Sequence, residues 1–190
     1  SGSAYKSGCC GIKYNPMKQI NLIAAIGKKM ELGFQNQLLC HLPADLKHFK
    51  SLTIGHTVVM GRKTWDSLPI KPLPNRRNLV LTSNRNLHFE GAEPIYSPEE
   101  LLAQINDQEE VFIIGGASVY KTFINIAQKL YITRIEGTFE ADVYFPKIDT
   151  SRWQLVEETY ISNDDKNPYS MIFQTYLAIP EAKPAHPRNN

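Results

Sequence analysis

Residues 38–50 read LLCHLPADLKHFK, and this stretch gives the clearest prediction of local structure and chemistry in the chain. Pro43 suits the first position of a helix, because its fixed φ fits there and its missing N–H needs no partner. Asp45 then falls in the first turn, with Leu46 beside it and Phe49 one turn further on. Such an Asp can simply interact with the positive end of the helix dipole. A carboxylate on an apolar face needs a polar partner, however, so Asp45 is also a candidate functional residue.

The composition of the 190-residue chain is typical of one soluble globular domain. Hydrophobic residues make up 42% and charged residues 21%, and the length allows a single domain with a substantial core. The formal net charge of +2 is too balanced to indicate nucleic-acid binding. No stretch has the length of a membrane span. Three cysteines, Cys9, Cys10 and Cys40, define no disulfide framework and favour a reducing, cytoplasmic compartment.

Apolar strand patterns and helix patterns alternate on both sides of residues 38–50. The expected strands lie at residues 20–26, 57–60, 78–81, 111–114 and 129–135, and the expected helices begin near residues 43, 62, 97 and 117, the last two running to about 105 and 127. This alternation predicts a mostly parallel sheet. Residues 152–179 predict an antiparallel hairpin with its turn at 162–168. Residues 27–42 show no clear period, which fits either a functional lid or a plain surface crossover.

The two ends of the chain lack any structural pattern. We expect residues 1–16 to be a disordered leader or an artificial remnant, residues 17–179 to form the domain, and residues 180–190 to be a flexible tail. We find no internal repeat, Walker loop, HExxH motif or zinc-ligand spacing, and therefore expect no metal site.

Several polar and glycine-rich segments lie where strands end, which is where α/β sheets bind ligands. Gly61 precedes a helix start that carries Arg62, Lys63 and Thr64, a pattern that suits either an anion site or a solvated basic turn. The pair Gly115–Gly116 allows close approach of a ligand, or forms only a tight turn, and is not a GxGxxG fingerprint.

Two further segments are candidates for ligand contact. Arg76 and Arg77 follow a proline-rich stretch, and an Arg fork can bind a carboxylate in a bidentate manner, although surface charge is the simpler interpretation of any single Arg. Thr82 and Ser83 follow the strand at residues 78–81, at its carboxyl end.

Together these segments make the chain resemble the dihydrofolate reductase family, in its short bacterial form. The motifs that carry the resemblance are LPADLKHFK at 42–50, VVMGRKTWDS at 58–67, PLPNRRN at 72–78, IGGASVY at 114–120 and KLYIT at 129–133. The resemblance spans residues 17–179. It implies a single α/β domain with a central eight-stranded mixed, mostly parallel sheet, about four flanking helices and an antiparallel C-terminal hairpin.

The resemblance implies an NADPH-dependent oxidoreductase that transfers a hydride to 7,8-dihydrofolate and forms 5,6,7,8-tetrahydrofolate for one-carbon metabolism and for thymidylate and purine synthesis. Asp45 would be the only ionisable side chain in the pterin pocket. It would accept hydrogen bonds from the pterin and favour protonation of the dihydropterin, while Thr133 would orient its carboxylate. The implied partners are dihydrofolate and antifolate inhibitors, with no nucleic acid and no membrane, and the implied state is a cytoplasmic monomer.

The resemblance also implies two sets of binding residues. Those for the substrate are Ile23, Leu38, Cys40, Leu46, Phe49, Lys50, Leu73, Arg76 and Ile114. Within this set Arg76, and not Arg77, would grip the glutamate α-carboxylate. Those for the cofactor are Ala25, Gly61, Arg62, Lys63, Thr64, Thr82, Ser83, Gly115, Gly116, Ala117, Ser118, Val119 and Tyr120. The basic and hydroxyl residues among them would hold the 2′-phosphate and pyrophosphate of NADPH, and Gly115–Gly116 would form a cis peptide.

The chain departs from the family pattern just before its central helix. Cys40 stands where relatives usually carry Trp, and Leu39 where they often carry Pro. Because Cys is smaller and a weak donor, the resemblance does not establish here the ordering of the water that the Trp normally holds against the pterin, nor the rate or the fit of inhibitors. One alternative is a reductase of riboflavin synthesis on the same fold, which should lack the carboxylate of Asp45. The other is an NADPH-binding module without catalysis, which only Cys40 favours.

Overall fold

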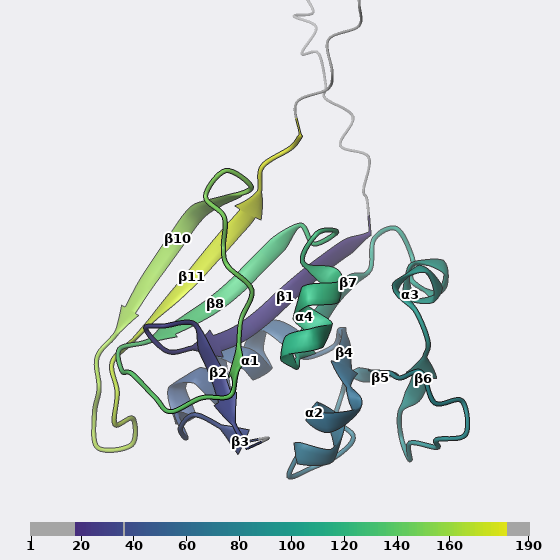
Figure 1. The fold of residues 1–190 in the computed structure, drawn as a ribbon, viewed down its shortest axis with the longest axis horizontal. Helices are drawn as coiled ribbons and strands as arrows, with labels where there is room; N and C mark the ends of the chain where they lie inside the picture. Colours follow the sequence, from purple (N-terminus) through teal and green to yellow (C-terminus); the bar gives the residue numbers. More distant parts are fainter. Residues whose placement is uncertain (1–17, 36, 182–190) are drawn as a thin grey trace, which may run out of the picture.

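The structure is a computed structural model that describes residues 18–35 and 37–181 (Figure 1). The predicted leader at 1–16, residue 17 of the predicted domain and residues 182–190 of the predicted tail lie outside the described residues. The first strand begins at Gln19 and the last ends at Ala178. None of the described helices combines the length and the apolar character needed to cross a membrane.

An eight-stranded mixed sheet forms the centre of the domain, in the order β10-β11-β8-β1-β7-β4-β5-β6. Its strands are β1 (Gln19–Ile26), β4 (Thr57–Gly61), β5 (Arg77–Leu81), β6 (Glu93–Ile95), β7 (Glu110–Gly115), β8 (Lys129–Ile135), β10 (Trp153–Ile161) and β11 (Met171–Ala178). The strands from β8 to β6 in this order pair in parallel. β11 pairs antiparallel with both β8 and β10. The predicted mixed sheet with an antiparallel hairpin is confirmed.

Within the described residues four helices flank the sheet: α1 (Pro43–Thr53), α2 (Arg62–Ser67), α3 (Pro98–Gln104) and α4 (Ala117–Phe123). α1 begins with Pro43 in its first turn, as predicted, and Ser97 Oγ caps α3 by accepting the N–H of Glu100 at 3.1 Å. The prediction that the last helix continues to residue 127 is wrong. The chain turns after Phe123, where the N–H of Ile126 donates to its carbonyl, because it must enter β8 at Lys129.

Alternate residues of the central strands supply two apolar clusters, one on each face of the sheet. One cluster joins the sheet to α3 and α4 through Leu22, Ile113, Leu101 and Phe123. The other joins it to α1 and α2 through Met60, Phe112, Phe49 and Trp65. Figure 1 shows α4 in front of β1 and β7, with the fainter α1 behind them. The sheet therefore fixes where α1 stands relative to the carboxyl ends of the parallel strands.

A second, three-stranded sheet corrects the prediction for residues 27–42. The segment is not an unstructured loop, because it contains β2 (Glu31–Phe34) and β3 (Gln37–Leu38), and β2 also pairs with β9 (Val143–Tyr144). These strands have four or two residues, too few to display a period of two. Their partner β9 follows about a hundred positions later, so only the tertiary fold brings the strands together.

The buried carboxylate of Glu31 fastens this small sheet to the rest of the domain. Glu31 is 1% exposed, and its carboxylate accepts the backbone N–H of Lys29 and, at 2.8 Å, that of Phe139. The turn between β1 and β2 is thereby attached to the segment that follows β8. Two backbone donors that would otherwise need water find a partner inside the protein.

Candidate active site

Asp45 and Thr133 form a polar pair between the first turn of α1 and strand β8. Thr133 Oγ1 donates to Asp45 Oδ1 at 2.6 Å, so the expected hydrogen bond is present. Thr133 is 3% exposed, Asp45 is half-buried, and Ala25 of β1 is the register partner of Thr133. The carboxylate therefore faces the middle of the sheet, with one oxygen held by a side chain that cannot move far.

Burial raises the pKa of the Asp45 carboxyl above its ordinary value, while the hydrogen bond from Thr133 and the proximity of His48 act in the opposite direction. The pKa of the Cys40 thiol is also raised, by burial and by the negative charge of Asp45. A thiol with a raised pKa stays protonated and uncharged. The site thus contains a carboxyl group that can hold a proton closer to neutral pH than an exposed Asp does.

A cavity of about 370 Å³, which includes space open to solvent, lies against Asp45. It is lined by Ala25, Leu32, Leu38, Leu39, Cys40, His41, Leu42, Asp45, Leu46 and Ile135. Five predicted site residues meet here: Ala25, Leu38, Cys40, Asp45 and Leu46. The non-helical segment before α1 also borders the cavity, so Cys40 and His41 line it together with Asp45.

Two contacts that the sequence did not indicate attach α1 to neighbouring elements. The imidazole of His48 stacks on the ring of Phe173 in β11, with centroids 3.9 Å apart and planes 4° from parallel. Asn167, in the loop between β10 and β11, accepts the backbone N–H of Ala44 at 2.9 Å. The spacing of three residues between Asp45 and His48 could have indicated the first of these. No local signal indicates the second, because Ala44 and Asn167 are 123 positions apart.

The other predicted substrate residues form a second group beyond Asp45. Ile23, Phe49, Leu73 and Ile114 belong to one apolar cluster, which is different from the cluster that holds Ala25 and Cys40. Lys50 is exposed. Because Asp45 and Phe49 lie one turn apart on the same face of α1, the helix contributes side chains both to the cavity and to this second apolar group.

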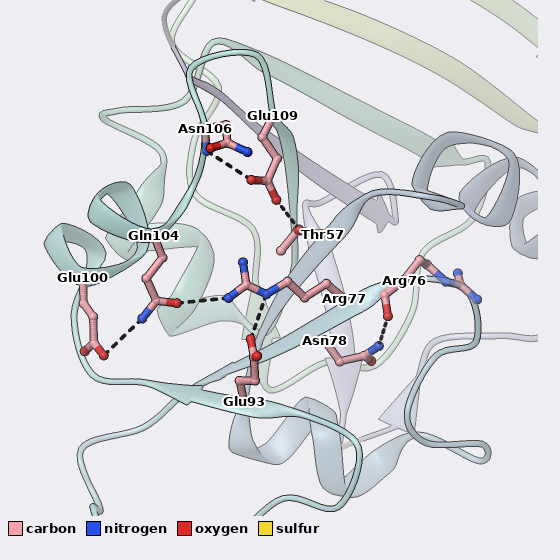
Figure 2. Close-up of polar contacts among 9 residues, drawn as sticks. All are labelled: Thr57, Arg76, Arg77, Asn78, Glu93, Glu100, Gln104, Asn106 and Glu109. Carbon is pink, nitrogen blue, oxygen red and sulfur yellow. Dashed lines mark hydrogen bonds and ion pairs between the residues drawn. The ribbon is translucent and has the colours of Figure 1, made fainter.

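The neighbouring Arg76 and Arg77 have different surroundings (Figure 2). Arg76 points toward α1: its guanidinium lies 5.9 Å from the ring centre of Phe49 and donates to Thr53 Oγ1 at 3.0 Å. Arg77 points the other way and pairs with Glu93 at 2.7 Å. Partial burial lowers the pKa of Arg76, whose guanidinium has no carboxylate within 4.0 Å among the described residues. Arg76 is thus the one available to an anionic ligand near Phe49.

The predicted cofactor residues lie at one edge of the sheet. Gly61, Leu81 and Ile95 are register partners across β4, β5 and β6, so the residues that follow them emerge side by side. These are Arg62, Thr82 and their neighbours Lys63 and Ser83. Arg62 is exposed, and its Nε lies 3.6 Å from Asp66 Oδ2 within the same helix.

Gly115 and Gly116 are joined by a cis peptide, as expected, and precede the first turn of α4, where Ala117 and Ser118 lie. A Cβ added to Gly61 would stand 2.9 Å from a methyl group of Val119, so β4 and α4 approach closely there. At Gly116 the nearest atom to such a Cβ is Thr64 Oγ1 at 3.6 Å, which leaves this backbone open to a ligand. Tyr120 is buried, and its hydroxyl donates to the carbonyl of Ile23 at 2.6 Å.

The chain is similar to known proteins over most of its length. The dihydrofolate reductase family model matches residues 19–178. The chain is 41% identical over 157 residues to dihydrofolate reductase of Bacillus subtilis, and these aligned residues make up 83% of the chain and 93% of the relative. It is 42% identical over 156 residues to dihydrofolate reductase type 3 of Salmonella typhimurium, covering 82% and 96%. Dihydrofolate reductase from Enterococcus faecalis, solved in complex with NADP(H) and RAB-propyl, superposes with a TM-score of 0.79 and 40% identity, covering 86% of the chain and 97% of that structure.

Proposed function

The chain belongs to the dihydrofolate reductase family, and we propose that it reduces 7,8-dihydrofolate to 5,6,7,8-tetrahydrofolate with NADPH as the electron donor. The observation that carries the proposal is the pair of Asp45 and Thr133, 2.6 Å apart beside a cavity. A reductase of riboflavin synthesis on this fold is not expected to place a carboxylate there. In the overall reaction the substrate gains one hydride and one proton, and NADPH becomes NADP⁺.

Asp45 would bind and orient the pterin and favour its protonation. Its carboxylate can accept hydrogen bonds from a ring N–H and the 2-amino group, and a carboxylate beside the pterin stabilises the protonated form of the substrate. Thr133 would keep that carboxylate in one orientation. Leu38, Cys40 and Leu46 would surround the pterin and limit access of water to the reacting atoms.

The remainder of the substrate would extend past α1 to Arg76. Phe49 and Leu73 offer apolar contacts for the benzoyl group, with the stem of the exposed Lys50 at its side. Arg76 lies over Phe49 and would bind the glutamate α-carboxylate. Arg77 is engaged with Glu93 and would not take part.

The opposite side of the site fits NADPH, which supplies the hydride when it is bound. The open backbone at Gly116 and the adjacent Thr64 suit the pyrophosphate. Arg62, Lys63, Thr82 and Ser83, which emerge at the neighbouring strand ends, would hold the 2′-phosphate. Ala25, which lines the cavity beside Asp45, would contact the nicotinamide amide through its backbone.

The decisive experiment mixes the protein with NADPH and dihydrofolate and follows the absorbance of NADPH. We expect steady decay that depends on dihydrofolate and that antifolate inhibitors suppress. Absence of decay at micromolar protein would refute the proposed reaction. NADPH binding without turnover would then favour a binding module.

The cofactor assignment has a separate test in Arg62→Ala. This variant should weaken NADPH much more than NADH, because only NADPH carries the 2′-phosphate. Lys121→Ala, in the last turn of α4, is a matched control that removes a cation outside the proposed site. Equal weakening of both nucleotides by Arg62→Ala would contradict the assignment.

We also propose that the chain functions as a monomer, as its resemblance to the family implies. Sedimentation velocity at the concentration of the assay tests this. A species of twice the 21.6 kDa chain mass that carries all the activity would contradict it.

A further inference from the structure

The loop between β10 and β11 holds the first turn of α1 from outside the helix. Leu42, at the N-cap of α1, offers no side-chain acceptor, and Pro43 has no N–H. The N–H of Ala44 donates to Asn167 Oδ1 at 2.9 Å. Ala44 directly precedes Asp45, so this bond fixes the backbone from which the carboxylate extends.

Asn167 is itself held in a single orientation. It is 5% exposed, and its Nδ2 and backbone N–H both donate to Asp164 Oδ1, at 2.9 and 2.7 Å. The N–H of Asp164 donates back to the carbonyl of Asn167 at 2.9 Å. A reversed amide would set Nδ2 against the N–H of Ala44 and Oδ1 against a carboxylate, so only the observed orientation satisfies both neighbours.

Three contacts connect α1 to neighbouring parts of the sheet, namely β8, β11 and the loop between β10 and β11. Asn167 holds Ala44, Thr133 of β8 holds Asp45, and Phe173 of β11 stacks on His48. Thr133 and Phe173 are themselves register partners. The position of the Asp45 carboxylate is therefore set by its backbone as well as by its hydrogen bond to Thr133.

We propose that Asn167 is a positioning residue for Asp45, and that Asp164 keeps Asn167 in place. The inference rests on the proposed function, in which Asp45 contacts the pterin. Without the bond from Ala44, the first turn of α1 gains freedom, and a small displacement of an orienting group is costly to the reaction. The cofactor residues lie on other elements and are not affected.

The test compares Asn167→Ala and Asp164→Ala with the wild type. Asn167→Ala should lower kcat roughly tenfold, leave the dissociation constant of NADPH within about twofold, and move the apparent pKa in the pH profile of kcat. Asp164→Ala should act in the same direction with a smaller effect. Asp164→Asn keeps an acceptor oxygen for Asn167 and should restore most of the activity.

Asn163→Ala is the matched control, because Asn163 is an exposed residue of the same loop that pairs with Ser170 and not with α1. It should retain wild-type kcat and pH profile. An unchanged kcat and pH profile in Asn167→Ala would overturn the proposal, as would an equal effect of Asn163→Ala. If Asn167→Ala does not fold, the kcat and the pH profile of Asp164→Ala test the proposal instead, and wild-type values of both would overturn it.

A readout independent of turnover separates this inference from the proposed function. The carboxyl pKa of Asp45 can be followed by ¹³C NMR in the wild type and in Asn167→Ala. A shifted pKa in the variant supports the positioning role, and an identical pKa overturns it. Failure of the wild type to reduce dihydrofolate would overturn the proposed function alone.

Discussion

At the scale of the residue, Asp45 is placed where the fold disfavours its charged form. Burial raises its pKa, so between the unfolded and folded pKa values the folded state binds more protons than the unfolded state. The free energy of unfolding therefore falls as the pH rises through that interval. The carboxylate costs the protein stability at neutral pH, which is expected of a group retained for its chemistry.

Replacement of Asp45 by Asn should separate activity from stability. We expect kcat at neutral pH to fall by orders of magnitude while the affinity for NADPH is nearly unchanged, because protonation of the substrate loses its support. The melting temperature should rise slightly at pH 7, and the difference should vanish below the ordinary Asp pKa of about 3.9. Kinetics and thermal melts across pH test this. A variant that melts lower than the wild type at pH 7 would contradict the second expectation.

The two neighbouring arginines allow a paired comparison. Arg76→Ala should raise the KM for dihydrofolate by roughly tenfold or more, because a charge-assisted bond is worth about 1.5–3 kcal/mol. Arg77→Ala removes the same kind of side chain but breaks only the surface pair with Glu93, and should leave KM unchanged. Steady-state kinetics of both variants decide. A matching rise in KM for Arg77→Ala would show that net charge, not a specific contact, attracts the substrate.

Local pattern predicted some of these residues and could not predict others. Asp45 was visible because Pro43 marks a helix start and its apolar neighbours make a carboxylate unusual. The role proposed for Arg76, as opposed to Arg77, came from the resemblance, and the contact of Arg76 with Phe49 is consistent with it. Asn167 could not be found, because its partner is distant in sequence and the amide is an ordinary loop residue by type.

At the scale of the element, the segment from 27 to 42 shows how tertiary pairing overrides a weak local signal. The strands β2 and β3 form because β9 and the buried Glu31 hold them, not because their residues alternate. The same dependence explains why α4 ends at Phe123, since the chain must turn into β8. Long apolar strands and proline-marked helix starts were predicted within a residue or two.

Removal of the Glu31 carboxylate should loosen this small sheet. Glu31→Ala leaves the N–H groups of Lys29 and Phe139 without their acceptor and should lower the free energy of unfolding by about 1–3 kcal/mol. Glu31→Gln keeps an acceptor oxygen and should lose less. Urea denaturation of the two variants measures the difference. If Glu31→Ala were as stable as the wild type, water would be serving these donors equally well.

At the scale of the whole molecule, the order of the strands assembles the site. The carboxyl ends of five parallel strands, β1, β8, β7, β4 and β5, lie at one edge of the sheet. Residues as distant in sequence as Ala25 and Thr133 therefore meet at this edge. The alternation of strands and helices predicted the parallel sheet, and the family resemblance implied eight strands, whereas neither the order of the strands nor the position of β6 was predicted. A three-residue strand such as β6 gives no pattern of its own.

Cofactor binding should stabilise the domain as a unit. A ligand present at a hundred times its dissociation constant adds about 2.7 kcal/mol to the free energy of unfolding, which corresponds to a rise of about 5–10 °C in Tm for a domain of this size. NADPH should produce this shift, and an equal concentration of NADH a much smaller one. Differential scanning fluorimetry with both nucleotides tests the expectation, and indistinguishable shifts would contradict it.

The two outer strands of the main sheet have a consequence for behaviour at high concentration. β10 is exposed at most positions, has a register irregularity between Leu155 and Glu157, and carries the neighbouring acid Glu158. β6 has only three residues, with Pro94 in the middle. The addition of a foreign strand is hindered by a break in register, by repulsion between acidic side chains and by a missing backbone N–H. These features hinder the addition of a foreign strand at both flanks of the sheet, and on β10 they oppose the attraction of the exposed Leu155, Val156 and Tyr160.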